Sequence, residues 1–572
     1  MFRTLLLAIG LLAACGALAA DGYQPDPDER RQQAATMRLL QGFLGNRQYA
    51  LRARPLDEVV EPAYQAYLDA LDPGQRYLSA ADLASLADAR AGFRAALEGK
   101  DLSPVFEVYA AYAARVDAHA AFVQAQLAGP GEPGAPGGAS PEAQAADQAT
   151  LETRWRHQLH EEWQALRAAG LSADETRRAL LARHADQARH VRGRSPADVF
   201  ALFANAFTSS IDPHGAYLPP MDVAALAGDA ADRVGVGLVV RRGTAFPTVQ
   251  QVVPGGPAAN AGVRAGEQIL ALADAAGTWT EAAGLRLESV VQAMRGEAGS
   301  SLQLRLRSPA GEVRQVTVVR AALEPAQLAA AGSIETVGDR RIGVLALPGF
   351  YADFEAARRG DPDARSAAAD VARLLGEFEA QGVDGVLLDL RGNGGGALRQ
   401  GVDVAALFLG PRPVVQVRET GGRVSVEAGA SGPRWGGSLA VLVDRDSAAA
   451  AEIVAAALQD HGRARVLGER SFGRGTVQQL IDLGRASAEP RGYLKFTVAD
   501  FFRVDGRAVD GVGVQPDVVL PEAGAAAPAE VPTPASLPPV QGFTPGPAPA
   551  TAEADALETV ARRLLGAAND GG

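Results

Sequence analysis

Apolar strands alternate with helices from residue 341 to residue 468, and this alternation restricts the fold more than any other feature of the sequence. The strand-like stretches read RIGVLALPGF, GVLLDL, LAVLVD and RARVLGE, and helical segments lie between them near 364–381, from 397 onward and at 448–460. Parallel strands need a crossover connection, which is usually a helix. The order therefore predicts a parallel or mixed sheet that is covered by helices.

Three turns that follow strands of this predicted sheet form the candidate site. Reactive groups collect beyond the carboxyl ends of the strands in an open α/β sheet. The strand that ends at Leu390 runs into RGNGGG, a Gly-rich turn that can aim backbone N–H groups at a developing negative charge. If the strands that end at Asp444 and Glu469 are parallel neighbours, Ala449 at the start of the next helix and Arg474 in the loop RSFGRG come together.

The rest of the chain is organised around this core, which we place at 325–521. Apolar residues three and four apart predict a helical N-terminal domain at 28–227, interrupted by a flexible Gly/Pro/Ala-rich insertion at 128–148. Short alternating strands punctuated by Gly and Pro predict a compact β-rich domain at 228–324. The Ala/Pro-rich tail at 522–572 is expected to be disordered to about residue 550, and then to form a short amphipathic helix that folds back or caps a partner.

The first 20 residues, MFRTLLLAIGLLAACGALAA, have the pattern of a secretory signal peptide at 1–20, with Arg3 ahead of a short apolar run. The sequence is compatible with two cleavage sites. ALA at 17–19 suits ordinary signal cleavage, which we favour slightly, whereas LAAC at 12–15 resembles a lipobox that would leave Cys15 lipidated. Both endings predict an exported, periplasmic protein that is either soluble or attached to the membrane only peripherally or through Cys15. Because Cys15 is the only cysteine, no disulfide is expected within the chain.

The charge balance and the histidines exclude some classes of function. A net charge of −12 gives no reason to expect nucleic acid or an anionic membrane surface as a partner. His157, His160 and Glu161 suggest metal ligands, but two histidines at i and i+3 without a third ligand are more typical of a solvated helix face. We therefore expect neither a metal site nor a cofactor.

Further motifs accompany the turns in a fixed order along most of residues 30–521. They are LDPGQRYL (71–78), SSIDPHGAYLPP (209–220), GVGL (235–238), LPGFY (347–351), DLRGNGGGAL (389–398) and GVGVQPDVVLP (511–521). With the segment from Val443 to Gln479, they resemble the C-terminal processing peptidases, and among these the periplasmic tail-specific proteases. The resemblance implies a multidomain α+β fold: a helical N-terminal domain, a PDZ-like β-rich domain and an α/β protease-like core with a mixed sheet of the ClpP/crotonase type.

The same resemblance assigns roles to individual positions. In that family a serine within an SASASE-like run attacks the peptide carbonyl, and an unprotonated lysine in a GKGTVQ-like loop acts as the general base. The serine position is Ala449 here and the lysine position is Arg474. Gln478 stands where a glutamine orients the base, and the backbone N–H groups of Gly396 and Ala450 would stabilise the oxyanion.

Both replacements remove chemistry that the reaction requires. A methyl group cannot form an acyl intermediate, and an arginine guanidinium stays protonated at every physiological pH. Ser447, Ser471 and Lys495 are the substitutes that we weighed. Ser447 is expected to cap the following helix, as Asp446 could also do, Ser471 is expected to be a loop hydroxyl, and no motif requires Lys495. His461, at the far end of the same helix, is expected to point away from the site.

Two hypotheses follow from this sequence. In the first, the chain is an exported pseudoprotease whose PDZ-like segment, Gly235, Val236, Gly237 and Leu238, binds the C-terminal tails of exported or unfolded proteins. An adaptor lipoprotein is a possible further partner. In the second, the chain is an active serine endopeptidase that trims or degrades periplasmic proteins from their C-terminal tails with a relocated nucleophile such as Ser447.

Overall fold

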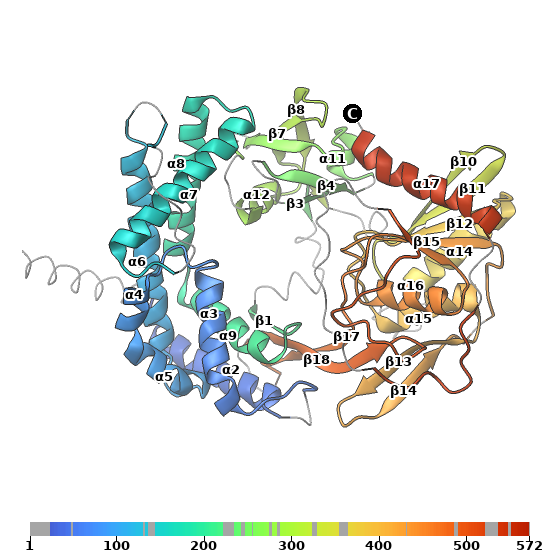
Figure 1. The fold of residues 1–572 in the computed structure, drawn as a ribbon, viewed down its shortest axis with the longest axis horizontal. Helices are drawn as coiled ribbons and strands as arrows, with labels where there is room; N and C mark the ends of the chain where they lie inside the picture. Colours follow the sequence, from blue (N-terminus) through green and yellow to red (C-terminus); the bar gives the residue numbers. More distant parts are fainter. Residues whose placement is uncertain are drawn as a thin grey trace, which may run out of the picture. The chain divides into compact units, whose positions relative to one another are not determined.

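The structure is a computed structural model, and it describes residues 23–46, 50–129, 132–134, 144–220, 234–241, 246–253, 255–273, 277–282, 287–322, 329–353, 364–430, 432–485, 490–520, 536–546 and 551–570. The signal peptide predicted at 1–20 lies outside these residues, as does most of the insertion at 128–148. The chain divides into two compact units. The first comprises Met1–Ala322 with Gln479–Phe496, and the second comprises Leu323–Gln478 with Thr497–Gly572 (Figure 1).

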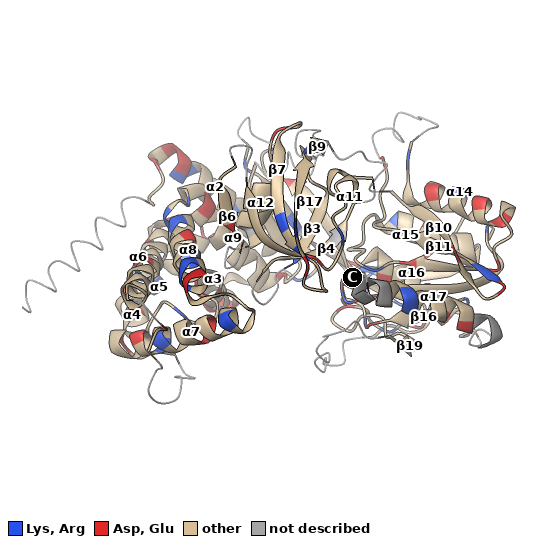
Figure 2. Ribbon diagram, turned by 90° about the horizontal axis from the view of Figure 1, so that it is seen from above, with Lys and Arg blue, Asp and Glu red and all other residues tan. Residues whose placement is uncertain are grey.

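Helices build the N-terminal half of the first unit. They are α2 (Pro27–Leu44), the 3₁₀ turn η1 (Leu56–Glu58), α3 (Val60–Leu71), α4 (Ala80–Ser85), α5 (Ala87–Leu97), α6 (Ser103–Gln126), α7 (Gln148–Ala168), α8 (Ala173–Arg192) and α9 (Pro196–Ile211). Ser79, Ser172 and Ser195 each begin a helix through a capping box with an acidic residue three positions later. Figure 2 shows acidic and basic residues interspersed along α7 and α8.

A cluster of titratable side chains lies between α6, α7 and α8, in which His119 is buried and His184 and Glu162 are partly buried. The Nε2 atom of His184 lies 3.0 Å from Oε2 of Glu162, and the ring of His119 packs edge-on against those of His184 and Trp155. Burial, with the neighbouring charge of His184, lowers the pKa of His119 to about 3. Burial acts to raise the pKa of Glu162, but the hydrogen bond and charge of His184, with the charge of Arg183, lower it to about 2.

This cluster predicts that acid destabilises the helical domain. The unfolded chain binds a proton at His119 near its ordinary pKa of 6.5, whereas the folded chain does so only near 3. The contribution of this group to stability is therefore complete above pH 6.5 and falls as the pH is lowered toward 3, by up to about 5 kcal/mol. Hydrogen exchange of α6–α8 should accelerate over this range, and His119→Phe should flatten the response. His461→Phe, in the second unit, is the control and should leave the pH dependence of exchange in α6–α8 unchanged. If this pH dependence were as steep in His119→Phe as in the wild type, His119 would not be its cause.

The β-rich domain forms the second part of the same unit. Its elements are β2 (Val234–Gly235), β3 (Leu238–Arg241), β4 (Thr248–Val252), α11 (Pro257–Asn260), β5 (Gln268–Ala273), β6 (Trp279–Glu281), α12 (Leu287–Met294), β7 (Ser301–Arg307), β8 (Val313–Val319) and β9 (Ala321–Ala322). The main sheet has the order β3-β4-β5-β7-β8, so β3 is an edge strand. Leu238 at the start of β3 and Val290 of α12 share the apolar core of this domain.

A six-stranded sheet with the order β10-β11-β12-β15-β16-β19 organises the second unit. Strand β10 is antiparallel to β11, and the other neighbours are parallel, which confirms the predicted mixed sheet. The elements are β10 (Ala331–Val337), β11 (Arg340–Ala346), α14 (Ala367–Ala380), β12 (Gly385–Asp389), α15 (Leu398–Leu409), β13 (Pro413–Glu419), β14 (Val424–Ala428), β15 (Ser438–Val443), α16 (Ala450–Asp460), β16 (Arg465–Gly468), β19 (Val518–Val519) and α17 (Thr551–Asp570).

Helices cover both faces of this sheet because successive strand residues point to opposite sides. Val386 and Leu388 of β12 share a core with α14, α15 and α16. Leu387, between them, packs in a second core with Leu557 and Val560 of α17. Figure 1 shows α17 beside the strands of this sheet. The predicted C-terminal amphipathic helix therefore folds back onto the sheet.

A further antiparallel sheet contains β13 and β14 together with β18 (Tyr493–Phe502), which pairs with both β13 and the short strand β1 (Ala216–Leu218). Strand β17 (Thr476–Asp482) also pairs with β18.

The tail differs from the sequence prediction between residues 536 and 546. We expected disorder to about residue 550, but this segment is held by backbone hydrogen bonds. The N–H of Leu537 donates to the carbonyl of Gly506 at 2.9 Å, and the N–H of Gly546 donates to the carbonyl of Asp460 at 3.1 Å. Partners so distant in sequence explain why composition alone indicated disorder. Within the described part of the chain, no helix combines the length and the apolar character needed to cross a membrane.

Candidate active site

Ala449 occupies a strained turn between β15 and α16. Its φ of 53° and ψ of −111° lie in a region that residues other than glycine rarely adopt and that costs about 1–3 kcal/mol. The backbone is held there from both sides, since the N–H of Ala448 donates to the carbonyl of Asn393 at 2.9 Å and the N–H of Ala449 donates to Oε2 of Glu452 at 2.8 Å. The turn thus presents a methyl group from a sharp bend between strand and helix.

The Gly-rich turn after β12 lies directly against this bend. A Cβ atom placed on Gly395 would lie 2.8 Å from the Cβ of Ala449 and 3.3 Å from the backbone nitrogen of Ala450, so only glycine fits. Gly395 and Gly396 also have positive φ angles of 105° and 142°. Among the described residues, the N–H groups of Gly396 and Ala450 donate no hydrogen bond. These are the two groups to which the family resemblance gives the role of oxyanion donors, and the two turns lie against each other.

Arg474 approaches the same place from the loop after β16. Its backbone N–H donates to Oε2 of Glu452 at 2.8 Å, the oxygen that also accepts from Ala449. Its guanidinium lies 4.9 Å from the ring centroid of Phe472, and its Nη1 atom donates to the carbonyl of Gly394 at 3.5 Å. The structure therefore brings together the two positions that the sequence predicted. Gln478 lies farther along, partly buried on β17.

Glu452 joins these elements, and the sequence reasoning missed it. Its side chain is fully buried, and its carboxylate accepts from the N–H groups of Ala449, Gly473 and Arg474 and from the hydroxyl of Ser471. Burial raises the pKa of Glu452, while these four hydrogen bonds act in the opposite direction. A glutamate three residues after a helix start is the sequence signal of a capping box, and this signal could have identified it.

The alternative nucleophiles are already engaged. We predicted that Ser447 caps α16, and this was wrong. Its buried hydroxyl instead donates to the carbonyl of Leu390 at 2.8 Å and accepts from the N–H of Asp444 at 2.9 Å. Ser471 is likewise buried between Glu452 and the N–H of Val514. Lys495 lies on β18, where its backbone is paired with Ala216.

The histidines of the sequence analysis lie elsewhere. His461 follows the last residue of α16, and its Nε2 atom lies 2.7 Å from the carbonyl of Pro413. His157 is buried, so the prediction of a solvated face was wrong for it: its helix packs this side inward. His160 lies 3.8 Å from Glu132 and Glu161 is exposed. Among the described residues, no group of three or more His, Cys, Asp or Glu side chains is arranged to hold a metal ion.

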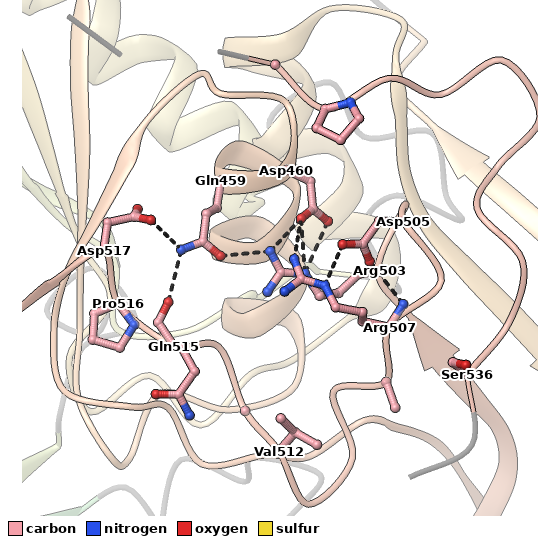
Figure 3. Close-up of a pocket in the computed structure, with 14 residues that line it drawn as sticks. Gln459, Asp460, Arg503, Asp505, Arg507, Val512, Gln515, Pro516, Asp517 and Ser536 are labelled. Atoms are coloured by element: carbon pink, nitrogen blue, oxygen red, sulfur yellow. Dashed lines mark hydrogen bonds and ion pairs between the residues drawn. The ribbon is translucent and has the colours of Figure 1, made fainter. Parts of the chain in front are cut away.

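A cavity of about 670 Å³ lies at the opposite end of α16 (Figure 3). Its walls include Gln459 and Asp460 at the end of the helix, with Arg503 paired to Asp460 and with Val512. A helix of 11 residues is about 16 Å long. The cavity therefore does not contain the positions of Ala449 and Arg474.

The segment Gly235–Leu238 leads into the edge strand of the β-rich domain. Gly237 has a φ of 74°, and its carbonyl accepts from the N–H of Val253 at 2.9 Å. The carbonyl of Val236 accepts from the N–H of Ala258 at 2.8 Å, so the segment is fixed at the start of α11. Gly235 has open space on its Cβ side.

Comparisons with known proteins agree with this architecture. Residues 341–520 match peptidase family S41, residues 47–221 match the tail specific protease N-terminal domain, and residues 248–308 match a PDZ domain. The chain is 32% identical over 335 residues to the tail-specific protease of Haemophilus influenzae, which covers 57% of this chain and 46% of that protein. It is 30% identical over 317 residues to the carboxyl-terminal-processing protease of Picosynechococcus sp., which covers 54% of this chain and 70% of that protein.

Among solved structures, the chain is similar to a photosystem II D1 C-terminal processing protease, with 26% identity, a TM-score of 0.39 and coverage of 63% of this chain and 92% of that one. The chain spans less than half of the length of the Haemophilus relative. Its helical N-terminal part, its PDZ domain and its S41 core nevertheless follow one another in the same chain, and it covers 70% of the Picosynechococcus relative at 30% identity. The chain is a member of the tail-specific, or carboxyl-terminal-processing, protease family.

Proposed function

We propose that this protein captures the C-terminal tails of exported or unfolded proteins without hydrolysing them. The observation that carries the proposal is Ala449: the strained bend that would present a nucleophile presents a methyl group, which has no lone pair to attack a carbonyl. The cation of Arg474, beside it, cannot accept a proton. The Gly-rich turn and the loop of Arg474 still pack around this bend, which supports a folded, non-hydrolytic role.

The alternative, an active endopeptidase with a relocated nucleophile, has less support. Ser447 is fully buried, with its hydroxyl bonded to Leu390 and Asp444. To attack a peptide, this hydroxyl would have to leave these partners, which also include the carboxylate of Asp444, whose Oδ1 atom lies 3.0 Å from it. Export to the periplasm, peripheral or lipid attachment and docking of an adaptor lipoprotein are parts of the proposal that rest on the sequence.

The PDZ domain supports the tail-binding half of the proposal. An extended peptide can add as a strand to an exposed sheet edge, while backbone N–H groups hold its terminal carboxylate. Strand β3 is such an edge, with Val239 44% exposed on it. The preceding residues Gly235–Gly237 would provide the N–H groups, and the side chain of Leu238 packs against the domain core.

Binding of a labelled peptide with a free C-terminus tests this proposal. We expect the full chain to bind it, to lose at least tenfold in affinity when the peptide is amidated, and to release no cleaved product. Gly237→Ala should weaken binding because a side chain at positive φ strains the loop. Gly266→Ala, with a φ of 86° in another turn of the same domain, is the matched control and should bind normally. Equal affinity for acid and amide peptides would contradict tail capture.

A further inference from the structure

We propose that the former active site is itself a receptor for a free carboxylate, formed by Arg474 with the backbone N–H groups of Gly396 and Ala450. This inference rests on the proposed loss of hydrolysis. It gives the protein a second binding site, in the protease-like core, in addition to the site in the PDZ domain. The ligand is the α-carboxylate of a peptide, such as the new C-terminus of a cleaved protein. One tail has a single terminal carboxylate, so the two sites bind two tails, or one tail alternately.

The first observation is a buried donor without an acceptor. Ala450 is 2% exposed, and its N–H has no hydrogen-bond partner among the described residues. Orphaned buried N–H groups are rare because each costs about 1–3 kcal/mol. In an active relative this cost would be offset when an oxyanion forms. Here no oxyanion can form, so the donor gains an acceptor only from a ligand that arrives with its own negative oxygen.

The second observation is the position of the Arg474 guanidinium. Its Nη1 atom is 3.5 Å from the carbonyl of Gly394, and two peptide units separate Gly394 from Gly396, a Cα distance of at most ~7.6 Å. The Gly395 position lies against the nitrogen of Ala450. The charged group and both N–H donors therefore surround one small region, and a guanidinium prefers the planar, two-oxygen geometry of a carboxylate.

The third observation is that Arg474 is held in place, while its guanidinium donates a single hydrogen bond among the described residues. Its guanidinium lies over the ring of Phe472, a residue that is 50% exposed, and its hydrogen bond to Gly394 is long. The neighbouring acid, Glu452, does not compete for this cation: its two oxygens accept from Ala449, Gly473, Arg474 and Ser471, in each case from a backbone N–H or a hydroxyl. Its negative charge is nevertheless close, so the receptor needs the arginine to offset it.

A photo-crosslinking experiment on the full chain tests the receptor. The probe is a peptide acid with a benzophenone side chain at its penultimate residue, and mass spectrometry maps the crosslinks. We expect one set in the PDZ domain and another within residues 390–400 or 447–475, both absent with the amidated peptide. Arg474→Gln should reduce the second set at least tenfold and leave the first unchanged, while Arg474→Lys should retain part of it. Gly237→Ala should reduce the crosslinks in the PDZ domain and leave the core crosslinks unchanged.

Each outcome separates the two proposals. Crosslinks in the PDZ domain alone would overturn the receptor and leave tail capture standing, whereas crosslinks in neither place would overturn both. Core crosslinks that persist in Arg474→Gln, or that form equally with the amide, would overturn the carboxylate role of Arg474. Because the side chain of Arg474 is only partly buried, we expect Arg474→Gln to fold. Arg474→Met is a second variant that must also lose the core crosslinks, and the melting temperatures of the two variants are compared.

Discussion

We expect the double substitution Ala449→Ser with Arg474→Lys to produce a chain that cleaves a tailed protein substrate, which the wild type is proposed not to cleave. Removing the nucleophile or the base of a comparable serine hydrolase reduces kcat by ~10⁶-fold, so we expect a gain of at least ~10³-fold even if other parts of the site have drifted. The strained bend at Ala449 is already present, and so are the N–H groups of Gly396 and Ala450, which have no acceptor in the described part of the chain. A serine hydroxyl would extend from the Cβ of Ala449 beside Gly395, which has no side chain of its own.

The single substitutions are the controls, because nucleophile and base act as a unit. Ala449→Ser alone would place a hydroxyl beside a cation that cannot take its proton, and Arg474→Lys alone would supply a base with nothing to activate. Both are expected to remain close to the wild type. The assay follows degradation of a protein with a free apolar C-terminus, together with labelling by a fluorophosphonate. Turnover by the wild type that Ser447→Ala abolishes would show that the protein is an active endopeptidase. A double variant that folds but neither cleaves nor labels would show that these two positions are not the dyad.

Much of the core could be predicted from sequence because its signals are local. Alternating strands and helices indicated the sheet, and the predicted helix at 448–460 is observed at Ala450–Asp460. The turns after β12, β15 and β16 meet because the carboxyl ends of neighbouring parallel strands share one edge of a sheet. The pairing of Ala449 with Arg474 was therefore accessible without a structure.

The errors concern side chains and backbone whose partners are distant in sequence. Ser447 stands where a helix cap is expected, but its hydroxyl bonds to Leu390, 57 residues earlier. Glu452 instead satisfies the backbone at the helix start and also holds the loop at residues 471–474. In the tail, Pro- and Gly-rich composition indicates disorder, yet backbone pairing with Gly506 fixes Leu537. Such long-range hydrogen bonds leave no periodic pattern in the sequence.

Glu452→Ala should destabilise the second unit by about 3–5 kcal/mol, a large effect for one substitution. The change would leave three backbone N–H groups and the hydroxyl of Ser471 without their acceptor in the interior, and each unsatisfied buried donor costs about 1–3 kcal/mol. The costs do not add fully because the loop can open and admit water. Hydrogen exchange should therefore increase first at residues 471–475 and at the start of α16, and a lower melting temperature should follow.

Glu452→Gln separates the loss of the acceptor from the loss of volume. Glutamine has nearly the same shape, but its NH₂ group would face either the N–H groups of Ala449 and Arg474 or the donors of Gly473 and Ser471. One pair of donors then meets another donor, so an intermediate loss of stability is expected even though no cavity forms. In the reactivated double variant, the same substitution should lower kcat more than KM, because it loosens the bend and the loop that together place the two catalytic positions. If Glu452→Gln kept wild-type hydrogen exchange at residues 471–475, the carboxylate would not be the group that joins the bend at Ala449 to this loop. The packing of α16 alone would then have to hold Ala449 and Arg474 close together.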